Sequence, residues 1–248
     1  MKEEQEDQED KKIVKEDYSQ YKIENLGEAY SKELITYKVI ILGLRGVGKT
    51  TISFRLAKNQ YIESSPTISL DVSNYQVKVN NKTIQIQLWD TCGNEEFAEK
   101  TPNLFKNTKF AILVYALNDR KSFEDIDKWI NILRNKAMGF FTILIGNKKD
   151  LEEERQVLEY EGEKLKNDYG LNYFLETSAK SGFNIIQLLE RIAIVIYENE
   201  KDKEVSIKKN ITLQKEDLRL NNEISNDNNS NNINKNKNKN KKRKKNCC

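Results

Sequence analysis

One glycine-rich segment carries the residues best suited to chemistry in this chain. The run Gly43-Leu44-Arg45-Gly46-Val47-Gly48-Lys49-Thr50 matches the pattern GxxxxGK[ST]. Glycines in this pattern let backbone N–H groups surround phosphate oxygens, and a helix that starts here adds partial positive charge. The Lys49 ammonium can neutralise β- and γ-phosphates, and the Thr50 hydroxyl can ligate magnesium. The segment predicts a nucleotide-phosphate site and leaves the base undefined.

The neighbouring sequence places this loop where phosphate binding requires it. Residues 37–42 form a predicted strand, and helical spacing begins at about Lys49. The same eight residues could form an ordinary glycine turn, but a loop between a strand and a helix favours the phosphate site.

From Tyr37 onward, short apolar runs alternate with longer segments of helical period, which is typical of an α/β fold with a mostly parallel sheet. One predicted helix carries apolar residues at positions 123, 126, 130 and 133, with Ser122 as its N-cap, and the last helix runs from Phe183 to about Tyr197. About five helices accompany roughly six strands, at 37–42, 71–79, 83–89, 110–117, 141–145 and 172–175, the second and third joined as a hairpin.

Charge divides the chain into three parts. Residues 1–36 carry 6 Lys against 11 acidic residues, and residues 201–248 carry 14 Lys or Arg against 6 acidic residues. The first part is interpreted as an acidic, disordered extension, and a solvated tail is favoured over a regulatory arm. Residues 200–248 form an Asn- and Lys-rich tail with too little apolar surface to fold. Residues 37–199 are the predicted domain.

Composition excludes several classes of protein. The start of the chain is charged rather than apolar, and no apolar run approaches the ~20 residues needed to span a bilayer, so we expect a cytosolic protein. Three cysteines, two of them adjacent, cannot build a disulfide framework. Because the chain has no histidine, a zinc cluster is excluded as well.

Three further segments together indicate which nucleotide, and so which base, the site binds. Asn147-Lys148-Lys149-Asp150 ends in a carboxylate that can accept from guanine N1–H and the 2-amino group, whereas adenine offers neither donor. This segment resembles the NKxD motif of the Ras superfamily, and Trp89-Asp90-Thr91-Cys92-Gly93 and Glu176-Thr177-Ser178-Ala179-Lys180 are similar to its WDTAG and ETSAK motifs. The resemblance covers residues 37–199 and implies a Ras-like P-loop G domain that binds GTP or GDP with Mg²⁺.

The resemblance also implies a role for each matching residue. Thr50, Thr67 and Asp90 would hold magnesium, and Lys49, Gly93 and Asn94 would act in GTP hydrolysis. The nucleotide contacts would come from Arg45, Gly46, Val47, Gly48, Lys49, Thr50, Thr51, Tyr61, Thr67, Gly93, Asn147, Lys148, Asp150, Ser178, Ala179 and Lys180.

Within the superfamily the chain is most similar to Rab proteins. Trp89 precedes the magnesium aspartate, Val114-Tyr115 resembles the start of their VYD, and the chain ends in two cysteines. Thr67 is similar to the switch I threonine that senses the γ-phosphate, and Tyr61 to the aromatic residue that flanks guanine. Tyr61 lies six residues before Thr67 where Rabs usually have seven, so switch I is predicted to be one residue short.

Two departures from the family pattern bear on hydrolysis. Asn94 replaces the glutamine that orients the attacking water, and Arg45 stands where the family has glycine or serine. A shorter amide and a bulky side chain near the γ-phosphate both predict slow hydrolysis, because positioning dominates phosphoryl transfer. The alternative is a hydrolysis-deficient, GTP-bound scaffold that recruits effectors constitutively.

The resemblance predicts partners and a location. Effector proteins would read Val72, Trp89 and Leu104 at the switch and interswitch surface, alongside an exchange factor, a GTPase-activating protein and a GDP-dissociation inhibitor. Cys247 and Cys248 match a double geranylgeranylation site served by an escort protein, and the basic run at 241–245 would add attraction to an anionic leaflet. We expect a lipid-anchored protein on the cytoplasmic face of an intracellular membrane, with a cytosolic pool, in vesicle traffic. Nucleic-acid binding by the basic run is disfavoured because no aromatics interleave with it.

Overall fold

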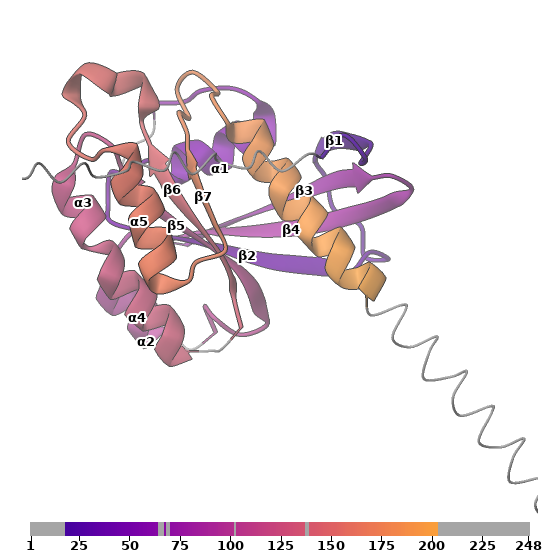
Figure 1. Cartoon of the computed structure of the whole chain (residues 1–248). Coiled ribbons are helices and arrows are strands. Elements are labelled where there is room, and N and C mark those ends of the chain that lie inside the picture. The colour runs from indigo at the N-terminus through magenta and orange to yellow at the C-terminus, as the bar shows by residue number, and fades with distance from the viewer. Residues whose placement is uncertain (1–17, 64–66, 68–69, 102, 137–138, 203–248) are drawn as a thin grey trace, which may run out of the picture. The chain divides into compact units, whose positions relative to one another are not determined.

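The computed structural model of the chain describes residues 18–63, 67, 70–101, 103–136 and 139–202. The chain divides between Tyr197 and Glu198, and beyond the division residues 198–202 are helical. Residues 18–197 contain one seven-stranded sheet with the order β1-β3-β4-β2-β5-β6-β7 (Figure 1). Its strands are β1 Ile23–Glu28, β2 Thr36–Leu42, β3 Asp71–Val79, β4 Lys82–Asp90, β5 Thr108–Ala116, β6 Phe141–Asn147 and β7 Tyr173–Glu176.

The sheet is mostly parallel. β2 pairs in parallel with β4 and β5, and β5, β6 and β7 continue in the same direction. β3 is antiparallel to both of its neighbours, β1 and β4. These pairings confirm the predicted α/β fold, including all six of the strands predicted from the sequence.

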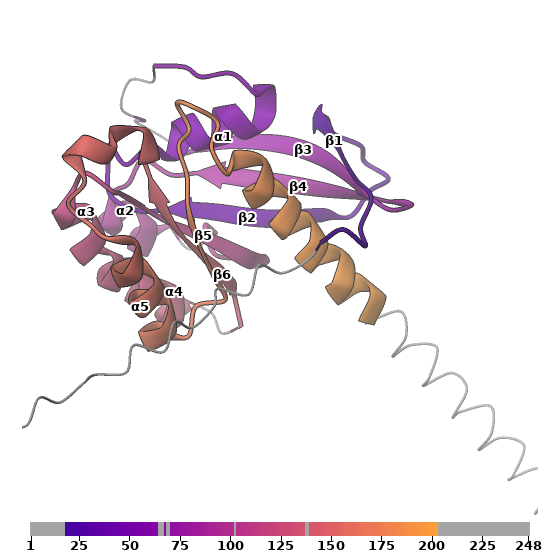
Figure 2. The ribbon, with the colours of Figure 1, turned by 45° about the horizontal axis from the view of Figure 1, so that its top comes forward.

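Helices cover both faces of the sheet, as Figures 1 and 2 show. They are α1 Lys49–Lys58, α2 Glu95–Lys100, α3 Arg120–Glu124, α4 Ile126–Lys136, a 3-10 segment η1 Lys149–Glu154, α5 Glu159–Tyr169 and a last helix over residues 185–197. In the part of the chain that the structure describes, no helix combines the length and apolarity needed to cross a membrane.

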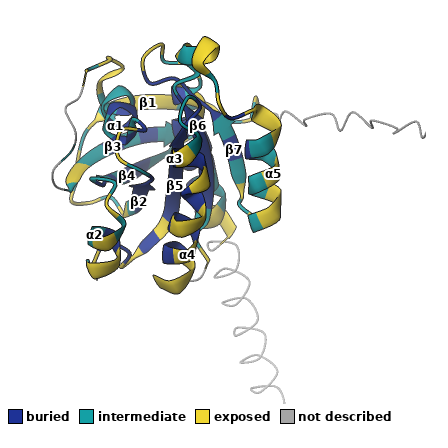
Figure 3. Cartoon of the chain, turned by 90° about the vertical axis from the view of Figure 1, so that its left-hand side faces the viewer, coloured by how far each residue is buried: buried dark blue, intermediate teal, exposed yellow. Residues whose placement is uncertain are grey.

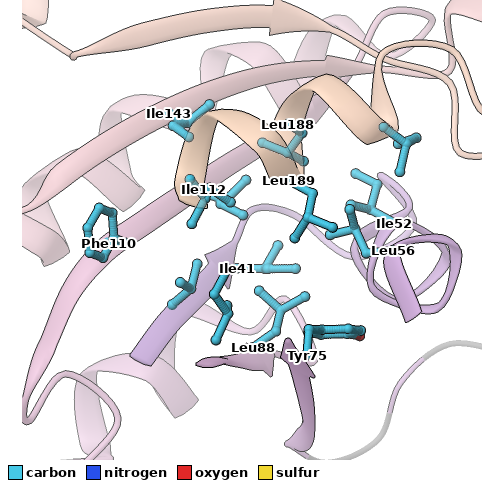
Figure 4. Close-up of a cluster of buried hydrophobic side chains, with 14 of the residues drawn as sticks. Ile41, Ile52, Leu56, Tyr75, Leu88, Phe110, Ile112, Ile143, Leu188 and Leu189 are labelled. Carbon is cyan, nitrogen blue, oxygen red and sulfur yellow. The ribbon is translucent and has the colours of Figure 1, made fainter. Parts of the chain in front are cut away.

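The hydrophobic core lies in two layers, one on each face of the sheet. In Figure 4, Ile52 and Leu56 of α1 and Leu188 and Leu189 of the last helix point toward Ile41 and its sheet neighbours. The other layer packs α2, α4 and the segment that leads into α5 against the opposite face. The central strands β5 and β6 are buried between the layers (Figure 3), which explains their unbroken apolar sequences.

The seventh strand corrects the prediction for the N-terminal extension. Residues 1–36 were expected to be disordered, but β1 forms an antiparallel ladder with the outer edge of β3, with an irregularity between Asn25 and Gly27. Just before β1, the ring of Tyr21 meets that of Tyr197 edge-on, with centroids 6.1 Å apart. The backbone of an open sheet edge can bind a strand of almost any sequence, which is why charge composition did not reveal β1.

Ser122 was predicted to be the N-cap of the helix with apolar residues at positions 123, 126, 130 and 133, and this prediction is also wrong. Asp119, not Ser122, is the N-cap of α3, and its carboxylate accepts from the backbone N–H of Ser122 at 3.2 Å. The hydroxyl of Ser122 instead accepts from the N–H of Ala116 at 2.9 Å and donates to the carbonyl of Asp119 at 2.7 Å. An aspartate carboxylate caps a helix at least as well as a serine, and Asp119 comes first along the chain.

Candidate nucleotide-binding site

The sequence motifs meet at one edge of the sheet. The glycine loop follows β2, Asp90 ends β4, Asn147 ends β6, and Glu176 ends β7. These four strands run in the same direction, so their carboxyl ends lie together. In open α/β sheets, ligands bind in the crevice outside those ends.

Two glycines keep the phosphate end of the site open. Gly48 has a φ of 99° at the N-cap of α1, and a Cβ there would lie 2.3 Å from Nδ2 of Asn147. Gly93 has a φ of 74°, and a Cβ there would lie 2.6 Å from Nζ of Lys49 and 2.7 Å from the backbone nitrogen of Arg45. A side chain at Gly93 would fill the space between the glycine loop and the segment after β4, and one at Gly48 would collide with Asn147.

Lys49 is a buried cation at the centre of this space. Its side chain is 5% exposed, and Nζ donates to the carbonyls of Gly43 and Leu44, each at 3.0 Å. Burial lowers the pKa of Lys49 to about 8, although Asp90 and Cys92 act in the opposite direction. A buried ammonium that donates to two carbonyl oxygens is suited to donate to phosphate oxygens, whose negative charge would balance its own.

Three oxygen-bearing side chains converge beside Lys49. Thr50 Oγ1 donates to Asp90 Oδ2 at 2.6 Å, and the hydroxyls of Thr50 and Thr67 are in hydrogen-bond contact. Asp90 is 1% exposed, and its Oδ1 has no partner among the described residues. Burial raises the pKa of Asp90, while Thr50 and Lys49 oppose that rise. A buried, unpartnered carboxylate oxygen beside two hydroxyls is the all-oxygen donor set that Mg²⁺ prefers, so these residues fit that ion.

At the other end of the site, Asn147 joins three motifs. Its Nδ2 donates to the carbonyl of Val47 in the glycine loop at 2.9 Å. Its Oδ1 accepts from Thr177 Oγ1 at 3.1 Å and from the backbone N–H of Ala179 at 3.2 Å. The 2% exposed side chain thus fixes the glycine loop against the segment that was predicted to meet the base.

The predicted base-reading carboxylate is held in a defined orientation. Ser178 Oγ donates to Asp150 Oδ1 at 2.5 Å, and Ser178 Oγ also accepts from the N–H of Ser181 at 3.0 Å. Lys148, two residues before Asp150, has a left-handed backbone with φ 70°. The ring of Tyr61 is 44% exposed. An anchored carboxylate can accept from a planar base that carries two adjacent donors, and an exposed aromatic ring is free to stack on such a base.

Sequence reasoning missed the network that supports this end. Arg155 forms two hydrogen bonds with the Glu176 carboxylate, at 2.7 and 2.9 Å, and Lys149 donates to the same group at 2.6 Å. Burial alone would raise the pKa of Glu176, but the bonds from Arg155 and Lys149 outweigh it and hold the pKa below its ordinary value. Arg155 is 21 positions from Glu176, so no local spacing indicated this pair.

Other predicted site residues are placed less directly. Thr51 is buried in α1, and Lys180 uses its carbonyl to accept from Arg55 at 3.3 Å. Arg45 and Asn94 are both exposed, and the Asn94 side chain accepts from the backbone N–H of Phe97.

The predicted effector surface requires one correction. Leu104 was expected to be presented to partners, but it is 0% exposed and packs in the core layer with α2 and α4. Removing this aliphatic side chain from water stabilises the folded domain, which favours burial over exposure. Val72 is 39% exposed, and Trp89 is partly buried, with Nε1 donating to Gln87 at 2.8 Å and Lys38 Nζ 3.4 Å from its ring centroid.

A mostly parallel sheet with a GxxxxGKT loop, a buried Asp–Thr cluster and an anchored NKxD segment defines a P-loop GTP-binding domain. The Ras family model matches residues 38–198, and the chain belongs to the Ras family. The Ras-related protein Rab-13 of Mesocricetus auratus is 38% identical over 162 residues, covering 63% of this chain and 78% of that protein. The Ras-related protein RABA6b of Arabidopsis thaliana is 37% identical over 161 residues, covering 64% of this chain and 70% of that protein.

These matches confirm the resemblance to Rab-like proteins of the Ras superfamily. Family membership makes the chain a small GTPase that binds GTP or GDP together with Mg²⁺. The matched residues include every predicted nucleotide and magnesium position and stop before the tail. Cys247 and Cys248 lie outside the described residues.

Proposed function

We propose that this protein is a Rab-like GTP-binding switch in intracellular membrane traffic, and that it hydrolyses GTP slowly. The observation that carries the proposal is the contact of Thr67, from the loop between α1 and β3, with Thr50 and hence with buried Asp90. A loop residue at the phosphate end of the site can be held there by the γ-phosphate, so that the order of the loop depends on the nucleotide.

Each residue has a task in the bound state. Lys49 neutralises the β- and γ-phosphates, Asp150 accepts from the guanine edge, and Tyr61 flanks the base. Thr50, Thr67 and Asp90 would hold Mg²⁺, and Asp90 Oδ1 has no hydrogen-bond partner among the described residues. When bound, Mg²⁺ neutralises charge on the phosphate oxygens during transfer.

The protein would switch because some of its contacts with the nucleotide require the γ-phosphate. Thr67 and the backbone of Gly93 would both contact that phosphate, and its loss on hydrolysis would release both. Exchange of GDP for GTP would order them again. Exchange factors, activating proteins and effectors are the partners that such a cycle needs, and Val72 and Trp89 are the proposed effector contacts.

Two features support slow hydrolysis. The backbone nitrogen of Arg45 lies beside Gly93, so a long exposed side chain begins next to the proposed γ-phosphate position. Asn94, the proposed water-orienting residue, has its side-chain oxygen engaged by Phe97 at 3.0 Å. The same engagement favours the second candidate function, a GTP-bound scaffold that recruits effectors constitutively.

The proposed location rests on the C-terminal sequence. Two geranylgeranyl groups on Cys247 and Cys248 would anchor the chain durably, because each buried CH₂ contributes ~0.8 kcal/mol. The Lys- and Arg-rich run at 241–245 would strengthen attachment to an anionic cytoplasmic leaflet. An escort protein would present the chain for prenylation, and a GDP-dissociation inhibitor would maintain a cytosolic pool.

Single-turnover GTP hydrolysis by the native protein and by Asn94→Gln, Arg45→Ser and the double variant tests the proposal. We expect slow native turnover and little gain from either single change, because each defect alone blocks the reaction. The double variant should be about tenfold to a hundredfold faster. If native turnover matches that of the double variant, slow hydrolysis is wrong. If no variant hydrolyses GTP, even with an activating protein, the scaffold function replaces the switch.

A further inference from the structure

A groove runs along β7, the last strand of the sheet. In the part of the chain that the structure describes, β7 pairs with β6 on one side and stands at the end of the strand order. Figure 1 shows it between α5 and the last helix. The groove has a volume of about 520 Å³, and all four residues of the strand, Tyr173–Glu176, line it. An edge strand is the place where a further extended segment can add to a sheet through backbone hydrogen bonds.

The two walls of this groove carry acidic side chains. Glu159 and Glu163 come from α5, and Glu190 comes from the last helix. Glu163 is paired with Lys166 at 2.6 Å, but no ion pair joins Glu159 or Glu190 to a cation among the described residues. Burial raises the pKa of Glu190, so a cation beside it would stabilise its charged form. The groove is therefore suited to a basic segment.

The N-terminal region of the chain reaches this groove. Tyr18, the first residue that the structure describes, is one of the lining residues. Its ring centroid lies 5.0 Å from the guanidinium carbon of Arg191, which is 4.0 Å from the ring centroid of Tyr173. Arg191 is 8% exposed, so Tyr18 packs against a buried residue of the last helix. The sequence that precedes Tyr18 therefore starts at the groove.

That preceding sequence has the properties that the groove requires. It contains Lys11-Lys12-Ile13-Val14-Lys15, in which two β-branched residues, favoured in strands, stand between lysines. The seven residues from 11 to 17 can span up to about 25 Å, whereas the four residues of β7 extend over about 13 Å. Phe183 lines the groove and is 48% exposed, so the β-branched residues have an apolar side chain to pack against.

We propose that residues 11–15 dock in the β7 groove as an added strand, with their lysines against the carboxylates of α5 and the last helix. Backbone hydrogen bonds to β7 would hold the segment, and its charge would select it over the acidic residues 3–10. The N-terminal region would then cover both edges of the sheet, because β1 already pairs with the outer edge of β3. The docking does not depend on the proposed switch function.

Hydrogen exchange of the full-length chain, measured by mass spectrometry, tests this docking. In a triple variant with Lys11→Glu, Lys12→Glu and Lys15→Glu, the peptide that contains Tyr173–Glu176 should exchange about fivefold faster, because strand hydrogen bonds are lost. The matched control makes the same charge change in the basic tail, with Lys241→Glu, Lys242→Glu and Lys244→Glu, and should exchange at the native rate.

A charge reversal in the groove tests the pairing itself. Adding Glu159→Lys and Glu190→Lys to the triple variant should return the exchange of the β7 peptide to within about twofold of the native rate. The native rate should also stay constant over about a hundredfold range of protein concentration, because the segment and the groove belong to one chain. The proposal is overturned if the triple variant exchanges at the native rate or if the reversal restores nothing. Faster exchange in the tail variant would assign the groove to the tail, and faster exchange on dilution would assign it to a second copy of the chain; either result also overturns the proposal.

Discussion

Replacing Asn147 with alanine should damage both the stability of the domain and the nucleotide site. The side chain is 2% exposed and makes three hydrogen bonds, to Val47, Thr177 and Ala179. These bonds connect three segments that are far apart in the sequence.

The hydrogen bonds of Asn147 determine how much stability the alanine variant should lose. A hydrogen bond contributes about 0.5–1.5 kcal/mol net, and a buried group left without a partner costs about 1–3 kcal/mol. In Asn147→Ala the carbonyl of Val47 and the N–H of Ala179 would both lose this partner. The variant should therefore unfold about 2–4 kcal/mol more easily, and its GDP should dissociate at least about tenfold faster.

Denaturant unfolding at several fixed GDP concentrations measures the first quantity, because bound ligand adds to apparent stability in a known way. Release of a fluorescent GDP analogue measures the second. Asn25→Ala is the matched control, since it truncates an exposed asparagine whose Oδ1 accepts from the N–H of Gly27. A loss below about 1 kcal/mol with unchanged GDP release would show that Asn147 does not hold the site together.

Two other substitutions test the nucleotide switch and the stability of the fold separately. Thr67→Ala should weaken binding of a GTP analogue about tenfold while GDP affinity stays nearly constant, because only the γ-phosphate state uses this hydroxyl; equal losses in parallel titrations would indicate a structural threonine. Because bonds from Arg155 and Lys149 hold the pKa of Glu176 below its ordinary value, the stability from this pairing is complete above about pH 4.3 and is lost as pH falls through the lowered pKa. Unfolding free energies measured from pH 6 to 3 should fall less steeply in Glu176→Gln, and an unchanged acid slope would contradict the pairing.

The sequence predicted most of the sheet and the site because both follow local rules. Buried parallel strands such as β5 and β6 must be apolar on both faces, so their runs stand out. Phosphate binding demands small residues at fixed spacing beside a lysine, which makes the loop before α1 recognisable. The meeting of Thr50 with Asp90 follows from the parallel order of β2 and β4.

Features that depend on tertiary contact were not predictable. β1 is stabilised by the edge of β3, and nothing in its own charged sequence encodes that pairing. The burial of Leu104 depends on how the segment after α2 packs on the sheet. Asn94 was interpreted by comparison with a catalytic glutamine, and only the geometry of α2 revealed its bond to Phe97.

Nucleotide affinity of the native protein and of Asp150→Asn tests the central claim most directly. Titrations with GTP and with xanthosine triphosphate, in the presence of Mg²⁺, should show tight GTP binding by the native chain. In the variant, GTP affinity should fall by about tenfold or more, because a charge-assisted pair of bonds to guanine is lost, and relative affinity for the xanthosine nucleotide should rise. An unchanged GTP affinity in Asp150→Asn would contradict the assignment of this site to guanine.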